Sequence, residues 1–205
     1  MMNSKLSYKN NLLKKTVLVL ILALLIEILV ASPSLSAFSL SGSLGVYTPS
    51  DQLVNNLYGS SSIGIIRLSI PYYSRFDWTI AVASQTLQSD NPGVSSEITL
   101  TTVMAGFEKR LSGPNLGESY IEPFLGVGLS IIHGSENLSY DNQNSSQYQS
   151  YVYGHYWEMG LLFPLLSSLD SWITVEIMQS NVVRMISSDI NLSGSIFKLG
   201  YRWQF

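Results

Sequence analysis

The sequence contains no cysteine and carries little charge. Without cysteine, the chain can form no disulfide framework, no thiolate metal site and no cysteine nucleophile. Charged residues make up 12% of the 205 residues and hydrophobic residues 46%, whereas an ordinary soluble domain is about 25% charged. These shortages indicate a depleted polar surface.

Basic residues are scarce as well, and the whole chain has a formal net charge of −3. Removing residues 1–37 would take away four lysines and only one glutamate, so the remainder is more acidic still. A protein that binds nucleic acid needs a basic patch, so no nucleic-acid partner is expected. The sequence also shows no phosphate-binding glycine loop, and we expect no cofactor and no bound metal.

The first 37 residues have the layout of a secretory signal peptide. Four lysines, the last of them Lys15, precede the apolar run "TVLVLILALLIEILVA", and the small-residue segment "SPSLSA" follows it. A basic start, an apolar centre and small residues before the cut are typical of such peptides. We predict cleavage after Ala37, with residues 38–205 as one domain. An uncleaved membrane anchor is the alternative, but the run is short for a spanning helix and contains Glu27.

After Ala37, short alternating segments recur, each followed by a turn. Each is about as long as the 9 to 11 residues with which a tilted strand crosses a bilayer, and a few are longer. An even number of strands lets the sheet close with both ends on one side. The segments cover residues 38–47, 63–70, 78–87, 99–111, 121–132, 153–163, 172–182 and 192–205.

The connections between these segments alternate in length. Longer connections rich in serine and asparagine, such as "HGSENLSYDNQNSSQYQS", follow the first, third, fifth and seventh segments. Tighter ones, such as "PYYSRFD", follow the second, fourth and sixth. Long loops on one side and short turns on the other are typical of bacterial outer-membrane barrels. The sequence therefore predicts an all-β fold, an eight-stranded antiparallel up-and-down transmembrane β-barrel preceded by a cleavable signal peptide.

The last segment, "FKLGYRWQF", separates two kinds of side chain. Because side chains in a strand alternate sides, Phe197, Tyr201, Trp203 and Phe205 share one face, while Lys198 and Arg202 share the other. In a closed barrel this strand would pair with the first, and Trp203 and Phe205 would lie in the aromatic girdle at the periplasmic interface.

The face that holds Lys198 and Arg202 predicts a lumen network of ion pairs. The same face collects small residues, among them Ser39, Ser41, Ser43, Gly126, Gly128, Ser130, Gly154 and Gly160. Balanced charges and small neighbours suit a narrow lumen, because unpaired buried charge is costly and space is limited. A lipocalin-like secreted barrel is the alternative. The predicted network consists of Arg67, Glu108, Arg110, Glu122, Glu158, Glu176, Lys198 and Arg202.

In its signal peptide, its eight segments, the stretch "GVYTPSDQLVNNLYG" and the terminal "YRWQF", the chain resembles the small eight-stranded outer-membrane barrels of the OmpA, OmpX and opacity-porin kind. The resemblance implies the bacterial outer membrane as location, with outer-membrane lipid and lipopolysaccharide as partners. It implies an assembly machinery that reads Tyr201, Trp203 and Phe205 as a signal. It also implies a structural or surface-interaction role in adhesion or the envelope, with an extracellular ligand held by the long loops.

The alternative function is a lipid A-modifying enzyme of the deacylase type. "VEIMQSNVV" resembles such barrels faintly, but Gln179 stands where a histidine base would precede Ser180, and serine without a base is a weak nucleophile. We therefore expect no enzymatic activity. The two histidines, His133 and His155, are expected on the lipid-side face near the outer interface, as neighbours if residue 133 opposes residue 155. A metal site with Glu136 and Asp141 is the alternative to an interfacial role.

Overall fold

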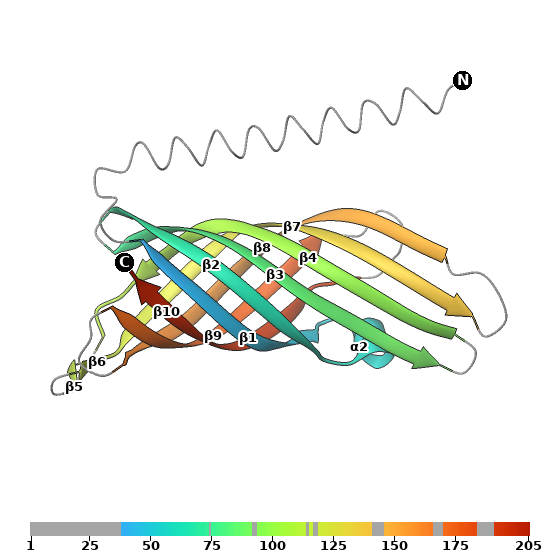
Figure 1. Ribbon diagram of the computed structural model, residues 1–205, viewed down its shortest axis with the longest axis horizontal. Helices are drawn as coiled ribbons and strands as arrows, with labels where there is room; N and C mark the ends of the chain where they lie inside the picture. Colours follow the sequence, from blue (N-terminus) through green and yellow to red (C-terminus); the bar gives the residue numbers. More distant parts are fainter. Residues whose placement is uncertain are drawn as a thin grey trace, which may run out of the picture. The chain divides into compact units, whose positions relative to one another are not determined.

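The described part of the chain forms a closed barrel. The computed structural model describes residues 38–73, 75–91, 94–113, 115–116, 119–140, 146–165, 170–183 and 191–205. Its eight long strands pair antiparallel in the order β1-β10-β9-β8-β7-β4-β3-β2, so that β1 closes against β10 (Figure 1). The predicted fold class is confirmed. The predicted signal peptide, residues 1–37, lies outside the described residues.

Each barrel strand pairs with the strands before and after it in the chain, as in an up-and-down barrel. A short two-stranded sheet formed by β5 (Asn115–Leu116) and β6 (Ser119–Tyr120) lies in the connection after the fourth barrel strand and was not predicted. The barrel strands are β1 (Ser39–Pro49), β2 (Ser61–Tyr73), β3 (Phe76–Asn91), β4 (Val94–Arg110), β7 (Glu122–Tyr140), β8 (Ser146–Pro164), β9 (Ser171–Val183) and β10 (Gly194–Gln204).

The first and last described residues meet at one end of the barrel. The backbone N–H of Phe205 donates a hydrogen bond of 2.9 Å to the carbonyl of Phe38. The two rings stack with centroids 4.7 Å apart, and the Trp203 ring lies 4.7 Å from the Phe205 ring. The aromatic end of the chain is therefore held in the barrel wall. We call this the terminus end, and the opposite end the loop end.

Four strands extend at the loop end into stretches that the sequence predicted as loops. The connections "QSDNPGVSSE" and "HGSENLSYDNQNSSQYQS" were interpreted as loops, but most of their described residues continue β3 and β4 or β7 and β8. These hairpins extend past their neighbours at the loop end, toward the right of Figure 1. These projecting parts carry serine, asparagine and glutamine on both faces. The alternation of apolar and polar residues that predicted the rest of each strand is therefore lost there.

A helix, α2 (Gln52–Tyr58), lies in the connection between β1 and β2, where the sequence predicted only a loop. Asp51 caps it, because its carboxylate accepts hydrogen bonds from the backbone N–H groups of Leu53 (2.8 Å) and Val54 (3.3 Å). Val54 is fully buried and belongs to the apolar cluster inside the loop end of the barrel. The capping aspartate and the apolar pair Val54 and Tyr58, four residues apart, were the signal for this helix.

Among the described residues, no helix is long and apolar enough to cross a membrane.

Replacing Asp51 with alanine is expected to loosen α2, because two backbone donors lose their acceptor. N-caps contribute about 1 kcal/mol, so amide exchange of residues 52–58 should accelerate roughly fivefold while the barrel strands exchange as before. Hydrogen exchange read by mass spectrometry measures this. The exposed neighbour Gln52→Ala is the control, and equal exchange in the two variants would show that the cap does not hold the helix.

Candidate functional site

The barrel wall has an apolar outer face, as strand alternation predicted. Outward side chains midway along the strands are large, apolar and exposed, with Leu44 at 77% and Leu129 at 71%. Toward the loop end the outward positions become polar, for example Thr48, Ser84 and Thr101. An apolar band of this kind is what a barrel presents to lipid hydrocarbon.

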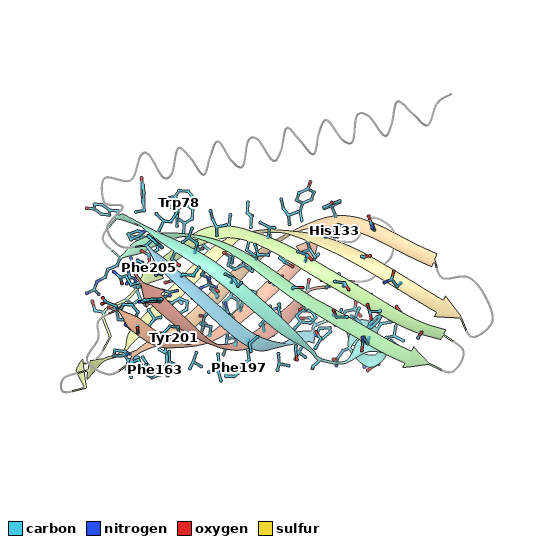
Figure 2. All side chains as sticks on the ribbon, in the orientation of Figure 1. Trp78, His133, Phe163, Phe197, Tyr201 and Phe205 are labelled. Carbon is cyan, nitrogen blue, oxygen red and sulfur yellow. The ribbon has the colours of Figure 1, made fainter. Side chains whose placement is uncertain are left out.

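Aromatic side chains gather on the outer face near the terminus end. Figure 2 labels Trp78, Phe163, Tyr201 and Phe205 in this part of the barrel, whereas His133 lies farther toward the loop end. The centroids of the Trp78 and Phe107 rings lie 3.9 Å apart. Such rings are typical of the membrane interface, where one side meets hydrocarbon and the other meets water. Trp203 and Phe205 lie at this end with their rings 4.7 Å apart, and their place at the periplasmic interface stays a prediction.

Six buried ionisable side chains meet inside the barrel. None is more than 4% exposed, and three are cations and three are carboxylates, so their formal charges cancel. They come from β2, β4, β8, β9 and β10 because alternation turns each of them inward. We call this set the charge layer: Arg67, Glu108, Glu158, Glu176, Lys198 and Arg202.

Two contacts of the charge layer span the full width of the lumen. The Arg202 guanidinium on β10 forms two hydrogen bonds with Glu108 on β4, at 2.6 Å and 2.7 Å. Arg67 on β2 lies 2.5 Å from the Glu158 carboxylate on β8. In each case the two strands are four places apart around the eight-stranded ring, and are therefore opposite each other. The bidentate pairing of Arg202 with Glu108 is among the strongest kinds of polar contact in proteins.

The remaining contacts join these two crossings into one network. Arg67 also lies 3.3 Å from Glu108 and 3.5 Å from Glu176. The Lys198 ammonium lies 3.0 Å from Glu158 and 2.5 Å from Glu176, its register partner on β9. Every charge in the layer therefore has a partner of opposite sign.

Arg110 and Glu122, which the sequence placed in the same network, form a separate group nearer the terminus end. Arg110 lies 3.3 Å from Asp77 and 3.9 Å from Glu122, and the side chains of Arg110 and Glu122 are partly exposed. Asp77 was missed, although it shares the inward face of β3 with Thr79 and Ala81. Continuing the alternation of that strand to its first residues would have found it.

Apolar side chains lie on both sides of the charge layer. On the terminus side, Phe124, Leu162 and Trp172 form a buried cluster, and the Phe124 ring lies 5.5 Å from the Arg202 guanidinium. On the loop side a larger buried cluster fills the lumen. This cluster was not predicted, because mainly charged and small residues were assigned to the inward face. Its members include Tyr47, Ile63, Leu100, Met104, Ile132, Met178 and Ile196.

At the loop end, a chain of hydrogen bonds links α2 to β4 and β7. Ser96 donates to the Glu136 carboxylate at 3.2 Å, so the Tyr58 hydroxyl, 3.0 Å from Ser96, is the donor to it. Burial, together with the Glu136 charge, raises the pKa of Tyr58 despite the hydrogen bond to Ser96, which keeps that donor protonated. Glu136, which the sequence placed in a long loop, thus lies on β7 and is the final acceptor of this chain.

A small cavity remains within the loop-side cluster. Its volume is about 30 Å³, and Tyr47, Leu100, Met178 and Ser180 are among its lining residues. This is room for one or two water molecules, and too little for a drug-sized ligand.

The structure separates the residues of the enzyme alternative. Ser180 lines the lumen cavity, whereas Gln179 points outward, accepting a hydrogen bond of 2.6 Å from Ser195. The histidines face outward, as expected, but the register that would make them neighbours does not occur: residue 133 opposes Tyr151, and residue 155 opposes Leu129 and Asn181. Within the described ranges, no group of three histidine, aspartate or glutamate side chains could hold a metal ion. Asp141 lies outside those ranges.

No protein-family model matches the sequence, and a search of curated proteins finds no match. Solved structures do resemble the barrel. Neisserial surface protein A matches with a TM-score of 0.61 at 12% identity, over 82% of this chain and 97% of that one. The outer membrane protein OprG from Pseudomonas aeruginosa matches with a TM-score of 0.55 at 9% identity, over 82% and 95%.

A third structure is Ail, the attachment invasion locus protein of Yersinia pestis, in complex with the heparin analogue sucrose octasulfate. It matches with a TM-score of 0.51 at 12% identity, over 82% of this chain and 98% of that one. Identities this low establish the fold alone. The chain has the fold of the small eight-stranded outer-membrane barrels that it was predicted to resemble, and the predicted location in the bacterial outer membrane agrees with that fold.

Proposed function

We propose that this chain is an integral outer-membrane barrel with a closed lumen and a structural or surface-interaction role in adhesion or envelope maintenance. The observation that carries the proposal is the charge layer, whose contacts cross the lumen twice between two apolar clusters. Its partners are then outer-membrane lipid and lipopolysaccharide around the wall, the assembly machinery that inserts it, and a ligand at the loop end.

The way the interior is filled supports the closed lumen. An eight-stranded barrel has room for side chains but not for an aqueous channel. An ion passing through would have to separate the Arg202 and Glu108 pair and cross two layers of buried apolar side chains. Both steps are costly, because the separated charges would lie in a low-dielectric interior.

Purified protein in a planar lipid bilayer is therefore expected to give no stable large channel. A general porin reconstituted in parallel under the same salt and voltage is the positive control. Stable openings of porin size from the folded protein would contradict the closed lumen, whatever the role of the loop end.

The surface-interaction part of the proposal rests on the projecting hairpins. β2 pairs with β3 only as far as Gln85, yet β3 continues to Asn91. In the part of the chain that the structure describes, β9 pairs with β8 only from Tyr153, yet β8 begins at Ser146. The four strands β3, β4, β7 and β8 therefore project past the described ends of β2 and β9 by about 20 Å along the strands, at roughly 3.3 Å per residue. Polar surface held on a rigid scaffold is where binding commonly occurs.

The chemistry of this surface differs from that of a receptor for sulfated ligands. Among the described residues of the loop end, no lysine or arginine faces outward, while Glu97 and Asp51 are partly exposed. The described part of this surface is thus acidic and rich in hydroxyl and amide groups. A protein or neutral saccharide partner suits it better than a polyanion.

Two deletions test the surface-interaction role. In one, residues 88–97 are replaced by Asn-Gly, so that the buried register partners Leu87 and Ile98 are kept and flank a two-residue turn. In the other, residues 136–150 are removed. Both should leave a folded barrel, because the charge layer is untouched. Loss of host-surface attachment with normal resistance to detergents supports the binding role. Unchanged attachment in both variants would contradict it and leave the structural role.

The absence of enzymatic activity is also part of this proposal. It is supported by the placement of Ser180 in the lumen and of His155 on the outer face, which puts the barrel wall between nucleophile and base. Mass spectrometry of lipid A from cells that overexpress the protein should show unchanged masses. Loss of one acyl chain, abolished by Ser180→Ala, would contradict the proposal and establish the deacylase alternative.

A further inference from the structure

The outward-facing positive charge of the described barrel is confined to one sector of the terminus end. Arg75 lies in the turn between β2 and β3, and Lys109 lies near the end of β4. Both side chains are exposed. The other described cations point into the lumen, where they contact carboxylates.

Local contacts hold both cations in place. Arg75 has a φ of 72°, which is a left-handed conformation that few residues other than glycine adopt. Its carbonyl accepts a hydrogen bond of 2.9 Å from Arg110, and its guanidinium donates to the Ser112 hydroxyl. Lys109 lies opposite Phe76 in the ladder, with its ammonium 4.7 Å from the centroid of that ring.

Neither cation is neutralised within the described part of the chain. No salt bridge there joins Arg75 or Lys109 to a carboxylate, although the adjacent Arg110 has two acidic partners. Across the barrel at the same end, the turn before β9 carries an exposed aspartate, Asp170. The terminus end therefore has a basic sector on the β2 to β4 side.

Aromatic rings surround the basic sector. Tyr72 and Tyr73 are 67% and 73% exposed, and the Tyr72 ring lies 6.2 Å from Trp78, which itself contacts Phe107. Rings of this kind lie at the level of lipid headgroups, with their apolar parts against the upper acyl chains. The two cations are therefore placed at headgroup depth.

We propose that Arg75 and Lys109 form a binding site for the phosphate of an anionic glycerophospholipid in the leaflet around the terminus end. A guanidinium offers paired donors to phosphate oxygens, and an ammonium adds a point charge. The exposed rings of Tyr72, Tyr73 and Phe76 contact the glycerol and the first acyl carbons. A zwitterionic lipid is bound more weakly, because its own ammonium offsets the phosphate charge.

The test is a competition between two lipids for the folded protein. The protein is incubated in detergent with equal amounts of phosphatidylglycerol and phosphatidylethanolamine, and the retained lipids are counted by native mass spectrometry. The variants are Arg75→Gln, Lys109→Gln, both together, and the charge-preserving pair Arg75→Lys with Lys109→Arg. Asp170→Asn, which removes one charge of the opposite sign at the same end, is the control. Circular dichroism confirms that each variant is folded.

The wild-type protein and the Asp170→Asn control should retain phosphatidylglycerol preferentially. Each neutralised cation should lower that preference roughly fivefold, and both together up to roughly 25-fold, while the charge-preserving pair keeps most of it. An unchanged preference in the doubly neutralised variant would overturn the proposal, and so would an equal loss in the charge-preserving pair. Parallel loss of both lipids would also overturn it, because the apolar belt rather than the two cations would then hold them.

Discussion

Replacing Arg67 with methionine is expected to lower the free energy of unfolding by about 3–5 kcal/mol, the usual cost of removing one partner from a buried ion pair. Arg67 lies within 3.5 Å of three carboxylates and is only 4% exposed. Without it, three carboxylates would face two cations in the charge layer. Urea unfolding of the barrel in lipid vesicles, followed by tryptophan fluorescence, measures the change.

A second substitution separates charge imbalance from lost packing. In Arg67→Met with Glu158→Gln, the charges balance again, because Arg202 still pairs with Glu108 and Lys198 still pairs with Glu176. The double variant should therefore be more stable than Arg67→Met alone, with a coupling energy of about 1–3 kcal/mol. Lys109→Met, which removes an outward cation, should change stability by less than about 0.5 kcal/mol. If the stability lost in the double variant equals the sum of the losses in Arg67→Met and Glu158→Gln alone, the two residues do not share a network.

Replacing Gly128 with alanine is expected to destabilise the barrel by about 3 kcal/mol or to prevent folding, at or above the usual upper range for overpacking. A Cβ atom at this position would lie 2.5 Å from the carbonyl oxygen of Ala105 and 2.6 Å from the Tyr156 ring. Gly128 is the register partner of Tyr156 on β8 and faces the lumen. The carbonyl belongs to the neighbouring strand β4, so it cannot retreat without disturbing the ladder.

Gly42 provides the matched control for this substitution. It lies on the outer face of β1, and a Cβ atom there would meet nothing within 4 Å. Gly42→Ala should therefore change the free energy of unfolding by no more than about 0.5 kcal/mol. Refolding yield into vesicles and urea midpoints measure both variants. If the two variants have similar stability, close packing around residue 128 does not require glycine at that position.

The number of strands, their antiparallel closure and their two faces could be predicted from the sequence. Alternation with period two is a local property, so each segment by itself shows which residues share a side. The inward positions of Arg67, Glu108 and Glu158 followed directly, and so did the exposed aromatic face of the last strand. The small inward residues were predicted too, but the space needed by charged side chains explains only part of them. Gly126 leaves room for the Glu158 carboxylate, whereas Gly128 leaves room for the ring of Tyr156.

The predictions failed where apolar and polar residues no longer alternate. The polar parts of β3, β4, β7 and β8 at the loop end were interpreted as loops. Helix α2 was also missed, although Asp51 and the apolar spacing that follows it mark a helix start. The loop-side apolar cluster was missed as well. Local alternation already placed these residues inward, because Ile63, Leu100 and Ile196 lie an even number of positions from Arg67, Glu108 and Lys198 on the same strands.

The sequence by itself therefore determined the barrel, its apolar outer face and the inward direction of its buried charges, because these depend only on alternation along each strand. Only the tertiary structure decided the partners. His133 opposes Tyr151 rather than residue 155, Arg110 pairs with Asp77 apart from the charge layer, and Arg202 reaches Glu108 on the opposite wall. Such pairs join residues that are far apart in the chain, often on strands that are not neighbours. They depend on the stagger of every strand around the ring, and no local pattern of residues specifies that stagger.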